Sequence, residues 1–262
     1  MRVITLTTDF GAQDWFVGTM KGVILRINPK VPVIDITHEL PASDIRAGAF
    51  ALMASYRFFP KGTVHMAVVD PGVGSKRRAI AVQTANYFFV GPDNGVLSFA
   101  LANEKIKSVR RLENERYFLK PLSHTFHGRD IFAPVAAHLS RGLDPRKLGA
   151  VETNFVRLPW PEPAVIRNSI TGEVIYVDRF GNAITNISNQ QLARVKGAHV
   201  FIRGKRVCAV KPFYQSVAVG KAVAVTGSSG FLEIAINGGS AARLLGLEVR
   251  NSVSVQRSIV GQ

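Results

Sequence analysis

The sequence predicts two domains: an α/β domain with a mainly parallel central sheet over residues 1–158, and a smaller β-barrel domain over residues 165–262. In the first part, short β-branched runs alternate with segments of helical period, as in a sheet with crossover helices. Three prolines in five positions, Pro159, Pro161 and Pro163, then predict a linker over residues 159–164. Beyond the linker, short β-branched runs separated by Gly and Asn indicate a small barrel or sandwich.

The elements of the first domain follow from local patterns. Apolar side chains from Trp15 to Ile27 share one helical face, and Ser43 and Asp44 are cap candidates for a helix that follows them. Helices are predicted at 15–27, 47–58 and 130–139, and strands at 3–8, 33–36, 63–69, 80–84 and 87–90. In the second domain, strands are predicted at 174–177, 183–187, 199–202, 222–225, 231–236 and 247–255.

The chain is strongly basic, with 33 Lys and Arg against 18 Asp and Glu, a formal charge of +15. Such an excess raises the hypothesis of a nucleic-acid-binding protein. However, residues 1–160 carry +8 and the remainder +7, so the excess is spread evenly rather than gathered in a patch. A generally basic surface is therefore the preferred interpretation, and a nucleic-acid partner is not expected.

The cysteine content and the hydropathy pattern limit the cellular locations and the cofactors that we expect for this protein. The single cysteine, Cys208, excludes an internal disulfide, and no Cys/His spacing indicates a metal site. The first residues, MRVITLTTDFG, lack the apolar core of a signal peptide, and no apolar run reaches the length of a membrane span. We therefore expect a cytoplasmic protein without membrane contact or metal.

Two aspartates stand where an α/β sheet places ligands, beyond the carboxyl ends of strands. Asp9 follows the first predicted strand and Asp70 follows the third. An Asp before Pro-Gly is also ordinary turn chemistry, so position alone leaves both interpretations open. The loop from Gly72 to Lys76 matches neither a P-loop nor a dinucleotide-binding fingerprint, which argues against ATPases and dinucleotide enzymes.

His127 precedes the last predicted helix of the first domain, with His124 three residues earlier. No third ligand lies at recognisable spacing, so a general acid/base or water-holding role is favoured over metal binding. In the second domain, the segments 176–187 and 226–239 concentrate Asp, Gly, Ser and Asn between strands. Each segment is compatible with a binding site or with a plain turn.

Six motifs occur together in one order: TTDFG, VVDPGVGS, GPDN, FHGRD, DRFGNAITNI and SSGFLEIAINGGSA. In this combination, from Thr7 to about Leu247, the sequence resembles the adenosine-forming S-adenosyl-L-methionine (SAM) hydrolases. This family is also called the SAM hydroxide adenosyltransferases and is related to fluorinase and chlorinase. The resemblance implies an α/β domain, a β-barrel domain and a homotrimer whose active sites lie between neighbouring subunits.

The resemblance also implies a reaction and a set of site residues. Water or hydroxide attacks the ribose C5′ of SAM and releases adenosine and L-methionine, without a cofactor. The water-activating residues would be Asp70, Arg77 and His127. Asp9 would bind the ribose hydroxyls, Asp178 and Ser228 the methionine end, Asn182 the adenine edge, and the backbone of Asn237 and Gly238 the adenine ring.

The chemistry of these residue types agrees with this assignment. A sulfonium leaves as a neutral thioether, so the reaction needs mainly a positioned nucleophile and a group that favours hydroxide or takes its proton. Arg77 near Asp70 would keep that carboxylate ionised. Three alternatives remain: a SAM-dependent halide transferase, against which His127 argues, a nucleic-acid-binding protein without turnover, and an inactive SAM sensor.

Overall fold

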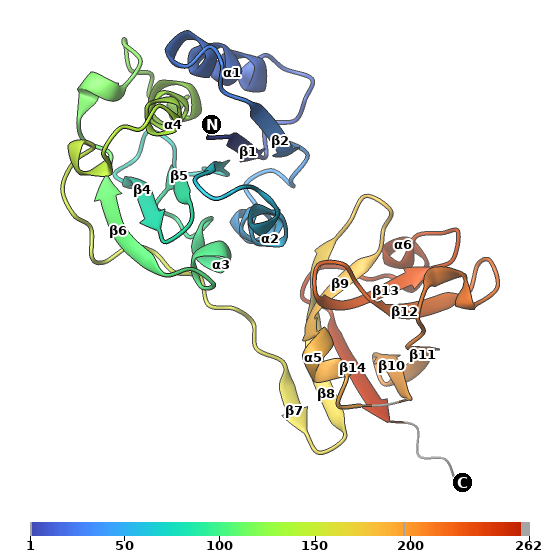
Figure 1. Cartoon of the computed structure of the whole chain (residues 1–262). Coiled ribbons are helices and arrows are strands. Elements are labelled where there is room, and N and C mark those ends of the chain that lie inside the picture. Colours follow the sequence, from blue (N-terminus) through green and yellow to red (C-terminus); the bar gives the residue numbers. More distant parts are fainter. Residues whose placement is uncertain (1, 196, 258–262) are drawn as a thin grey trace, which may run out of the picture. The chain divides into compact units, whose positions relative to one another are not determined.

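The computed structural model describes residues 2–195 and 197–257, and it divides into two units, Met1–Pro159 and Trp160–Gln262 (Figure 1). The division falls at the start of the proline-rich segment. Residue 1 of the predicted first domain and residues 196 and 258–262 of the predicted second domain lie outside the described residues.

The first unit is built on a six-stranded mixed sheet in the order β2-β1-β3-β5-β4-β6. Its strands are β1 (Ile4–Thr8), β2 (Val33–Thr37), β3 (Val64–Val68), β4 (Ala79–Thr84), β5 (Phe88–Pro92) and β6 (Ile106–Arg111). The pairs β1·β2, β1·β3 and β3·β5 are parallel, whereas β4 runs antiparallel to β5 and β6. The predicted mainly parallel sheet is therefore only partly right. Residues 85–87 join β4 to β5, and three residues cannot make the crossover that a parallel pair needs.

Helices cover both faces of this sheet (Figure 1). The helices α1 (Phe16–Ile27) and α4 (Ala133–Ser140) pack on one face, and α2 (Ile45–Ser55) and α3 (Ser98–Leu101) on the other. The predicted apolar face of α1 is confirmed for Met20 and Ile24, which are buried in the core with residues of β1 and β3. It is wrong for Trp15, which precedes the helix and is exposed. Asp44 caps α2 by accepting a hydrogen bond from the backbone N–H of Ala47.

Two predicted helices differ in detail from the observed ones. The helix predicted at 47–58 begins at Ile45 and ends at Ser55, followed by a 3₁₀ turn at Tyr56–Phe58. The helix predicted at 130–139 starts with a π-helical turn, Gly128–Phe132, before α4. Short 3₁₀ turns also occur at Glu115–Tyr117, Pro145–Lys147 and Tyr214–Ser216.

The second unit is an antiparallel, barrel-like sheet in the order β11-β10-β14-β8-β9-β13-β12, with β7 paired to β8. Its strands are β7 (Ala164–Ile166), β8 (Ser169–Val177), β9 (Ala183–Ser188), β10 (Ala198–Ile202), β11 (Lys205–Ala209), β12 (Ala222–Thr226), β13 (Phe231–Ile236) and β14 (Ser252–Arg257). Two short helices, α5 (Asn189–Leu192) and α6 (Ala241–Leu245), accompany them. A bridge between Val210 and Ala224 connects the end of β11 to β12, so the barrel is nearly closed.

Sequence patterns missed three strands, β6, β7 and β11, and misplaced the start of β8 and β14. The strand β7 begins at the end of the predicted proline-rich linker, and β8 begins at Ser169 rather than at 174. The strands β6 and β11 were not predicted, because Lys and Arg interrupt their apolar alternation; β6 is an edge strand, where charged residues are common. The strand predicted at 247–255 begins only at Ser252. Arg250 has φ = 74°, a left-handed conformation that ends any continuous strand through it.

His65 on β3 is a fully buried histidine in the central sheet of the first unit. Its ring stacks on Phe89, with 5.2 Å between centroids, and its Nδ1 lies 2.8 Å from the Thr5 hydroxyl. Burial lowers the pKa of His65 to about 3. Folding therefore requires the neutral imidazole, and the ordinary histidine pKa applies only in the unfolded chain.

We expect this histidine to make stability depend on pH. Below about pH 6.5 the unfolded chain binds a proton that the folded chain rejects, so the free energy of unfolding falls by about 1.4 kcal/mol per pH unit from this residue. Between pH 6.5, where the unfolded histidine is already half protonated, and pH 4.5 the loss is roughly 2 kcal/mol. Urea titrations of the wild type and His65→Phe at both pH values measure it: the variant should lose correspondingly less stability, and equal losses would refute the assignment.

Candidate active site

The loop after β3 folds back so that Arg77 pairs with Asp70. The Arg77 Nε lies 2.9 and 3.0 Å from the two carboxylate oxygens of Asp70, and its Nη2 lies 2.5 Å from Oδ2. Both side chains are largely shielded, at 11% and 5% exposure. Because a paired and poorly hydrated guanidinium fork is a strong charge-assisted donor, this contact fixes the orientation of the carboxylate.

Gly74 makes this return of the loop possible. It adopts φ = 76°, and a Cβ at this position would lie 2.2 Å from the backbone oxygen of His124. Any other residue would therefore push the loop away from the segment that carries the histidines. The VVDPGVGS motif thus contains both Asp70 and the glycine, Gly74, that lets Arg77 reach the Asp70 carboxylate.

His127 completes the group, at the N-terminal end of the π-helical turn Gly128–Phe132. Its Nδ1 lies 2.7 Å from Nη2 of Arg77. A guanidinium only donates hydrogen bonds, so Nδ1 must be the acceptor and must carry no proton. The neutral imidazole therefore has its proton on Nε2, where it can donate a hydrogen bond.

The surroundings of His127 favour this neutral form. Burial, followed by the charge of Arg77, lowers the pKa of His127, and the carboxylates of Asp70 and Asp130 only partly oppose this shift. Protonation would place a second N–H against the guanidinium. We therefore treat His127 as a neutral donor at neutral pH.

Asp9 and Asp70 line one cavity of about 330 Å³. Its other lining residues are Phe10, Phe16, Ser43, Pro71, Thr125 and Phe126. Asp9 is oriented by the backbone N–H of Ser43, 2.8 Å from its Oδ2. The first unit therefore gathers four predicted site residues, Asp9 and Asp70 at the cavity and Arg77 and His127 behind Asp70.

Sequence reasoning missed two features of this cavity. Phe10, Phe16 and Phe126 form an aromatic cluster with ring centroids 5.2 to 6.0 Å apart. Phe10 and Phe126 flank Asp9 and His127 in the motifs TTDFG and FHGRD, so an aromatic beside each polar residue was the available indication. Such an aromatic surface suits a flat ligand.

The second missed feature is Asp130, which is fully buried beside the trio Asp70, Arg77 and His127. Its carboxylate accepts hydrogen bonds from Arg129 and, at 2.7 Å, from the backbone N–H of Ser123. It thereby holds the segment that carries Thr125 and Phe126 into the cavity. The sequence places Asp130 only at the start of a predicted helix and in the FHGRD motif, and neither position indicates its contact with Ser123.

In the second unit, Asp178 and Asn182 lie together in the turn between β8 and β9. Asp178 accepts hydrogen bonds from the backbone N–H groups of Phe180 and Asn182, both at 2.9 Å, and from the Asn182 side chain at 3.1 Å. These contacts are those of an Asx turn. The plain-turn interpretation therefore holds for the local structure, and the binding roles of both residues remain predictions.

Asn237 and Gly238 follow the last residue of β13, and Ser228 precedes its first residue, so they lie at opposite ends of the strand. Ala183 pairs with Ile234, so the Asp178–Asn182 turn lies at the same end as Asn237 and Gly238. Asn237 donates to the backbone oxygen of Val217, and Gly238 adopts φ = 72°. Ser228 is exposed in the turn that precedes β13.

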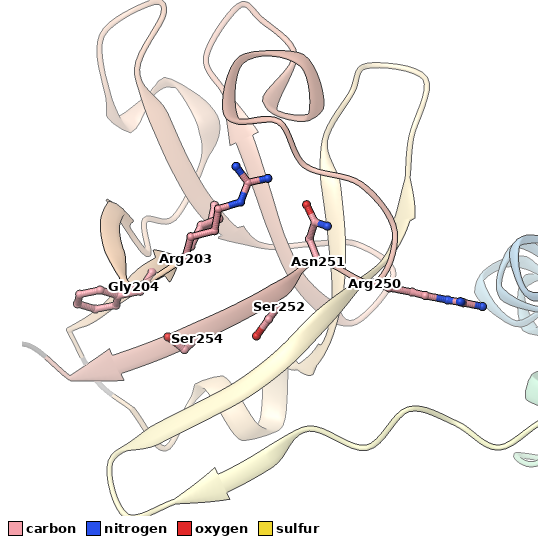
Figure 2. A pocket seen from close by; sticks show the side chains of 8 residues that line it. Arg203, Gly204, Arg250, Asn251, Ser252 and Ser254 are labelled. Carbon is pink, nitrogen blue, oxygen red and sulfur yellow. The ribbon is translucent and has the colours of Figure 1, made fainter.

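A second cavity of about 290 Å³ lies beside the β10–β11 turn and the start of β14. Its lining includes Arg203, Arg250, Asn251 and Ser252. Figure 2 shows that the side chains of Arg203 and Arg250 extend in different directions. Without convergent polar groups, this cavity is not a candidate active site.

The described residues contain neither a cluster of metal ligands nor a helix that could span a membrane. Among residues 2–195 and 197–257, no three or more His, Cys, Asp or Glu side chains gather as a metal site would require. Across the same described residues, every helix is too short or too polar to cross a bilayer.

The decisive comparison concerns family models for two domains that together cover most of the chain. The SAM hydroxide adenosyltransferase N-terminal domain matches residues 4–149, and the C-terminal domain of the same family matches residues 172–254. The chain belongs to the SAM hydroxide adenosyltransferase family. The resemblance inferred from the six motifs is thereby confirmed.

Individual relatives agree with this family membership. An (R)-S-adenosyl-L-methionine hydrolase of Thermus thermophilus is 41% identical over 95% of this chain and 97% of the relative. One from Salinispora tropica is 42% identical over 93% and 94%. A fluorinase of Nocardia brasiliensis is more distant, at 25% identity over 97% and 96%.

Solved structures extend the SAM hydroxide adenosyltransferase comparison to the fold. The crystal structure of a conserved protein from Thermotoga maritima superposes with a TM-score of 0.93 at 38% identity, covering 97% of this chain and all of the other. A conserved protein from Thermus thermophilus gives a TM-score of 0.81 at the same identity and coverage.

Proposed function

We propose that this protein hydrolyses SAM to adenosine and L-methionine by attack of water or hydroxide on the ribose C5′. The observation that carries the proposal is the hydrogen-bonded trio of Asp70, Arg77 and His127, whose carboxylate lines the cavity that also contains Asp9. The family and the names of its hydrolase relatives support the same reaction.

The trio gives each residue a distinct task at the nucleophilic water. His127 donates its Nε2 proton to the water oxygen and fixes a lone pair toward C5′. Asp70 takes the proton that the water loses on attack: Arg77 makes two contacts to Oδ2 and one to Oδ1, so a lone pair stays available on Oδ1. Arg77 holds the Asp70 carboxylate in place and lends positive potential to the forming hydroxide.

Bond changes at the substrate complete the reaction without a further acid. The oxygen of water bonds to C5′ while the C5′–S bond breaks, and its electron pair neutralises the sulfonium to the thioether of methionine. The aromatic wall of Phe10, Phe16 and Phe126 keeps bulk water from the reacting carbon, which strengthens the electrostatic effect of the trio. The proposed reaction therefore needs neither a metal nor a cofactor.

The remaining site residues keep the roles that the family resemblance implies. Asp9 suits the ribose diol, because one carboxylate can accept two hydroxyl hydrogens. Asp178 and Ser228 would bind the methionine end, Asn182 the adenine edge, and the backbone of Asn237 and Gly238 the adenine ring. We also propose a homotrimer with active sites shared between neighbouring subunits, which light scattering tests against a 28.5 kDa chain. A cytoplasmic location is proposed because the one cysteine, Cys208, is a free thiol.

Product analysis tests the proposed reaction. Purified protein, treated with EDTA, is incubated with SAM in chloride-free buffer and then with added chloride or fluoride. We expect adenosine and methionine in equal amounts, unchanged by chelator or halide. Formation of 5′-halo-adenosine would instead support the halide transferase, and methylthioadenosine or intact SAM would contradict the proposal.

A further inference from the structure

Two residues of the motif GPDN, Asp93 and Asn94, form a turn directly after β5, and no proposed role at the site uses them. In the sheet, β5 lies between β3 and β4. Because β5 runs parallel to β3 and antiparallel to β4, its carboxyl end meets the end of β3 and the start of β4. Asp70 follows β3 and Arg77 precedes β4, so the turn lies at both ends of the loop that carries them.

The side-chain amide of Asn94 contacts the peptide group that precedes Asp70. Its Nδ2 donates a hydrogen bond of 2.8 Å to the backbone oxygen of Val69, and its Oδ1 accepts one of 3.2 Å from the backbone N–H of Val96. A carbonyl only accepts and an N–H only donates, so these two partners allow one orientation of the amide. Val69 is fully buried, and its peptide plane restricts the direction in which the Asp70 side chain leaves the backbone.

Asp93 holds the other end of the same loop. Its backbone N–H donates to the backbone oxygen of Arg78 at 2.9 Å, and its carboxylate lies 2.6 Å from Nη2 of the Arg78 guanidinium. The carboxylate also accepts a hydrogen bond of 2.7 Å from the backbone N–H of Val156. The Asp93 side chain is 1% exposed, so little water competes for these contacts. Since Arg78 directly follows Arg77, the turn fixes the loop on both sides.

Proton transfer to Asp70 is the step that a displaced loop would impair most. Arg77 donates to both oxygens of this carboxylate, which must still face the cavity with a free lone pair. A shift of about 1 Å keeps the charge in place but moves the proton acceptor out of line, which can lower a rate about 100-fold. Asp9, the other carboxylate of the cavity, is oriented by Ser43 and does not depend on this turn for that contact.

We propose that Asn94 is a positioning residue for the hydrolysis, which acts through the Val69 carbonyl to direct the Asp70 carboxylate at the attacking water. Asp93 anchors the far end of the loop through Arg78, so that Arg77 meets Asp70 from a fixed direction. This inference rests on the proposed function and deepens it, because it assigns the GPDN motif to the proton-transfer step. Such a residue supports turnover and contributes little to substrate binding.

Kinetics and calorimetry on two variants of Asn94 test the proposal. Asn94→Ala removes both contacts of the amide, whereas Asn94→Asp keeps the shape and the acceptor for Val96 but loses the donor to Val69. We expect both variants to lower kcat for SAM about 10- to 100-fold. Their affinity for S-adenosyl-L-homocysteine, which lacks the sulfonium leaving group and is not turned over, should change less than about twofold.

Asn103→Ala is the matched control, because Asn103 also donates its amide to a backbone oxygen of the first unit, that of Phe99 at 3.0 Å. It should change neither kcat nor affinity. Unchanged kcat in both Asn94 variants would overturn the proposal, and so would a loss of affinity as large as the loss of kcat. If only Asn94→Ala fails to fold in a thermal melt, Asn94→Asp decides by the same comparison; if neither variant folds, Asn94 is a structural residue and the proposal is wrong.

A double variant shows whether Asn94 acts through Asp70. With Asp70→Asn already present the proton acceptor is gone, so the further change Asn94→Ala should lower the residual kcat less than about twofold. The same factor in the wild-type and the Asp70→Asn backgrounds would show an independent effect and contradict the proposal.

Crystal structures of the wild type and the Asn94 variants give a readout that needs no turnover. We expect the Asp70 carboxylate to lose at least one of its three contacts with Arg77, while Asp9 keeps its contact with Ser43. An Asp70 carboxylate that stays in place in both variants would overturn the proposal. If the wild-type protein does not turn over SAM, the proposed hydrolysis fails, whereas the position of Asp70 in these structures still decides the role of Asn94.

Discussion

Substitution of Asp70 by asparagine is expected to lower kcat for SAM about 100- to 10,000-fold, the usual cost of removing a general base. Asparagine has nearly the same shape, but it cannot take the proton of water, and its amide hydrogens cannot pair with Arg77 as a carboxylate does. Steady-state kinetics at neutral pH give kcat, and calorimetry gives the affinity for SAM, which we expect to change little.

Asp9→Asn is the matched variant for this experiment, because it neutralises the other aspartate of the same cavity. It should raise the dissociation constant for SAM and affect kcat less than Asp70→Asn. A reversal of this pattern, with Asp70→Asn impaired mainly in binding, would show that the roles of the two carboxylates are exchanged.

Glutamine in place of His127 should retain much more activity than alanine at that position. The imidazole donates from Nε2, and the amide nitrogen of glutamine can occupy a similar place and also donate. Alanine removes the donor and leaves the guanidinium of Arg77 without this partner, so we expect kcat to fall about 100- to 10,000-fold. Rate measurements on both variants, with SAM affinity as the control, give the comparison.

The same pair of variants distinguishes a donor from a base. If His127 took the proton of water, glutamine would be as inactive as alanine, because an amide has no useful basicity. Equal and severe losses in kcat would therefore contradict the tautomer that the contact with Arg77 requires.

Much of the site could be predicted because its residues lie in short motifs at strand ends. Asp70 and Arg77 are seven residues apart in one loop, and Gly74 already indicates a tight turn. His127 is 50 residues from Arg77 in the chain, so only the family resemblance could connect them before the fold was known.

Other features depend on tertiary structure that local patterns do not contain. The connection of three residues between β4 and β5 makes this pair antiparallel. Local sequence patterns, however, do not indicate which strands of the sheet are neighbours. The strand β6 carries three basic residues, and only its edge position makes such a strand stable. The carboxylate of Asp130 holds a loop through the backbone N–H of Ser123, a contact that its place at the start of a predicted helix does not indicate.

Hydrolysis in ¹⁸O-labelled water tests the central claim most directly. If the trio of Asp70, Arg77 and His127 directs water to C5′, mass spectrometry should find one labelled oxygen in the adenosine, at the 5′ position, and none in the methionine. Unlabelled 5′-methylthioadenosine together with labelled homoserine would place the attack on the methionine side chain and contradict the mechanism.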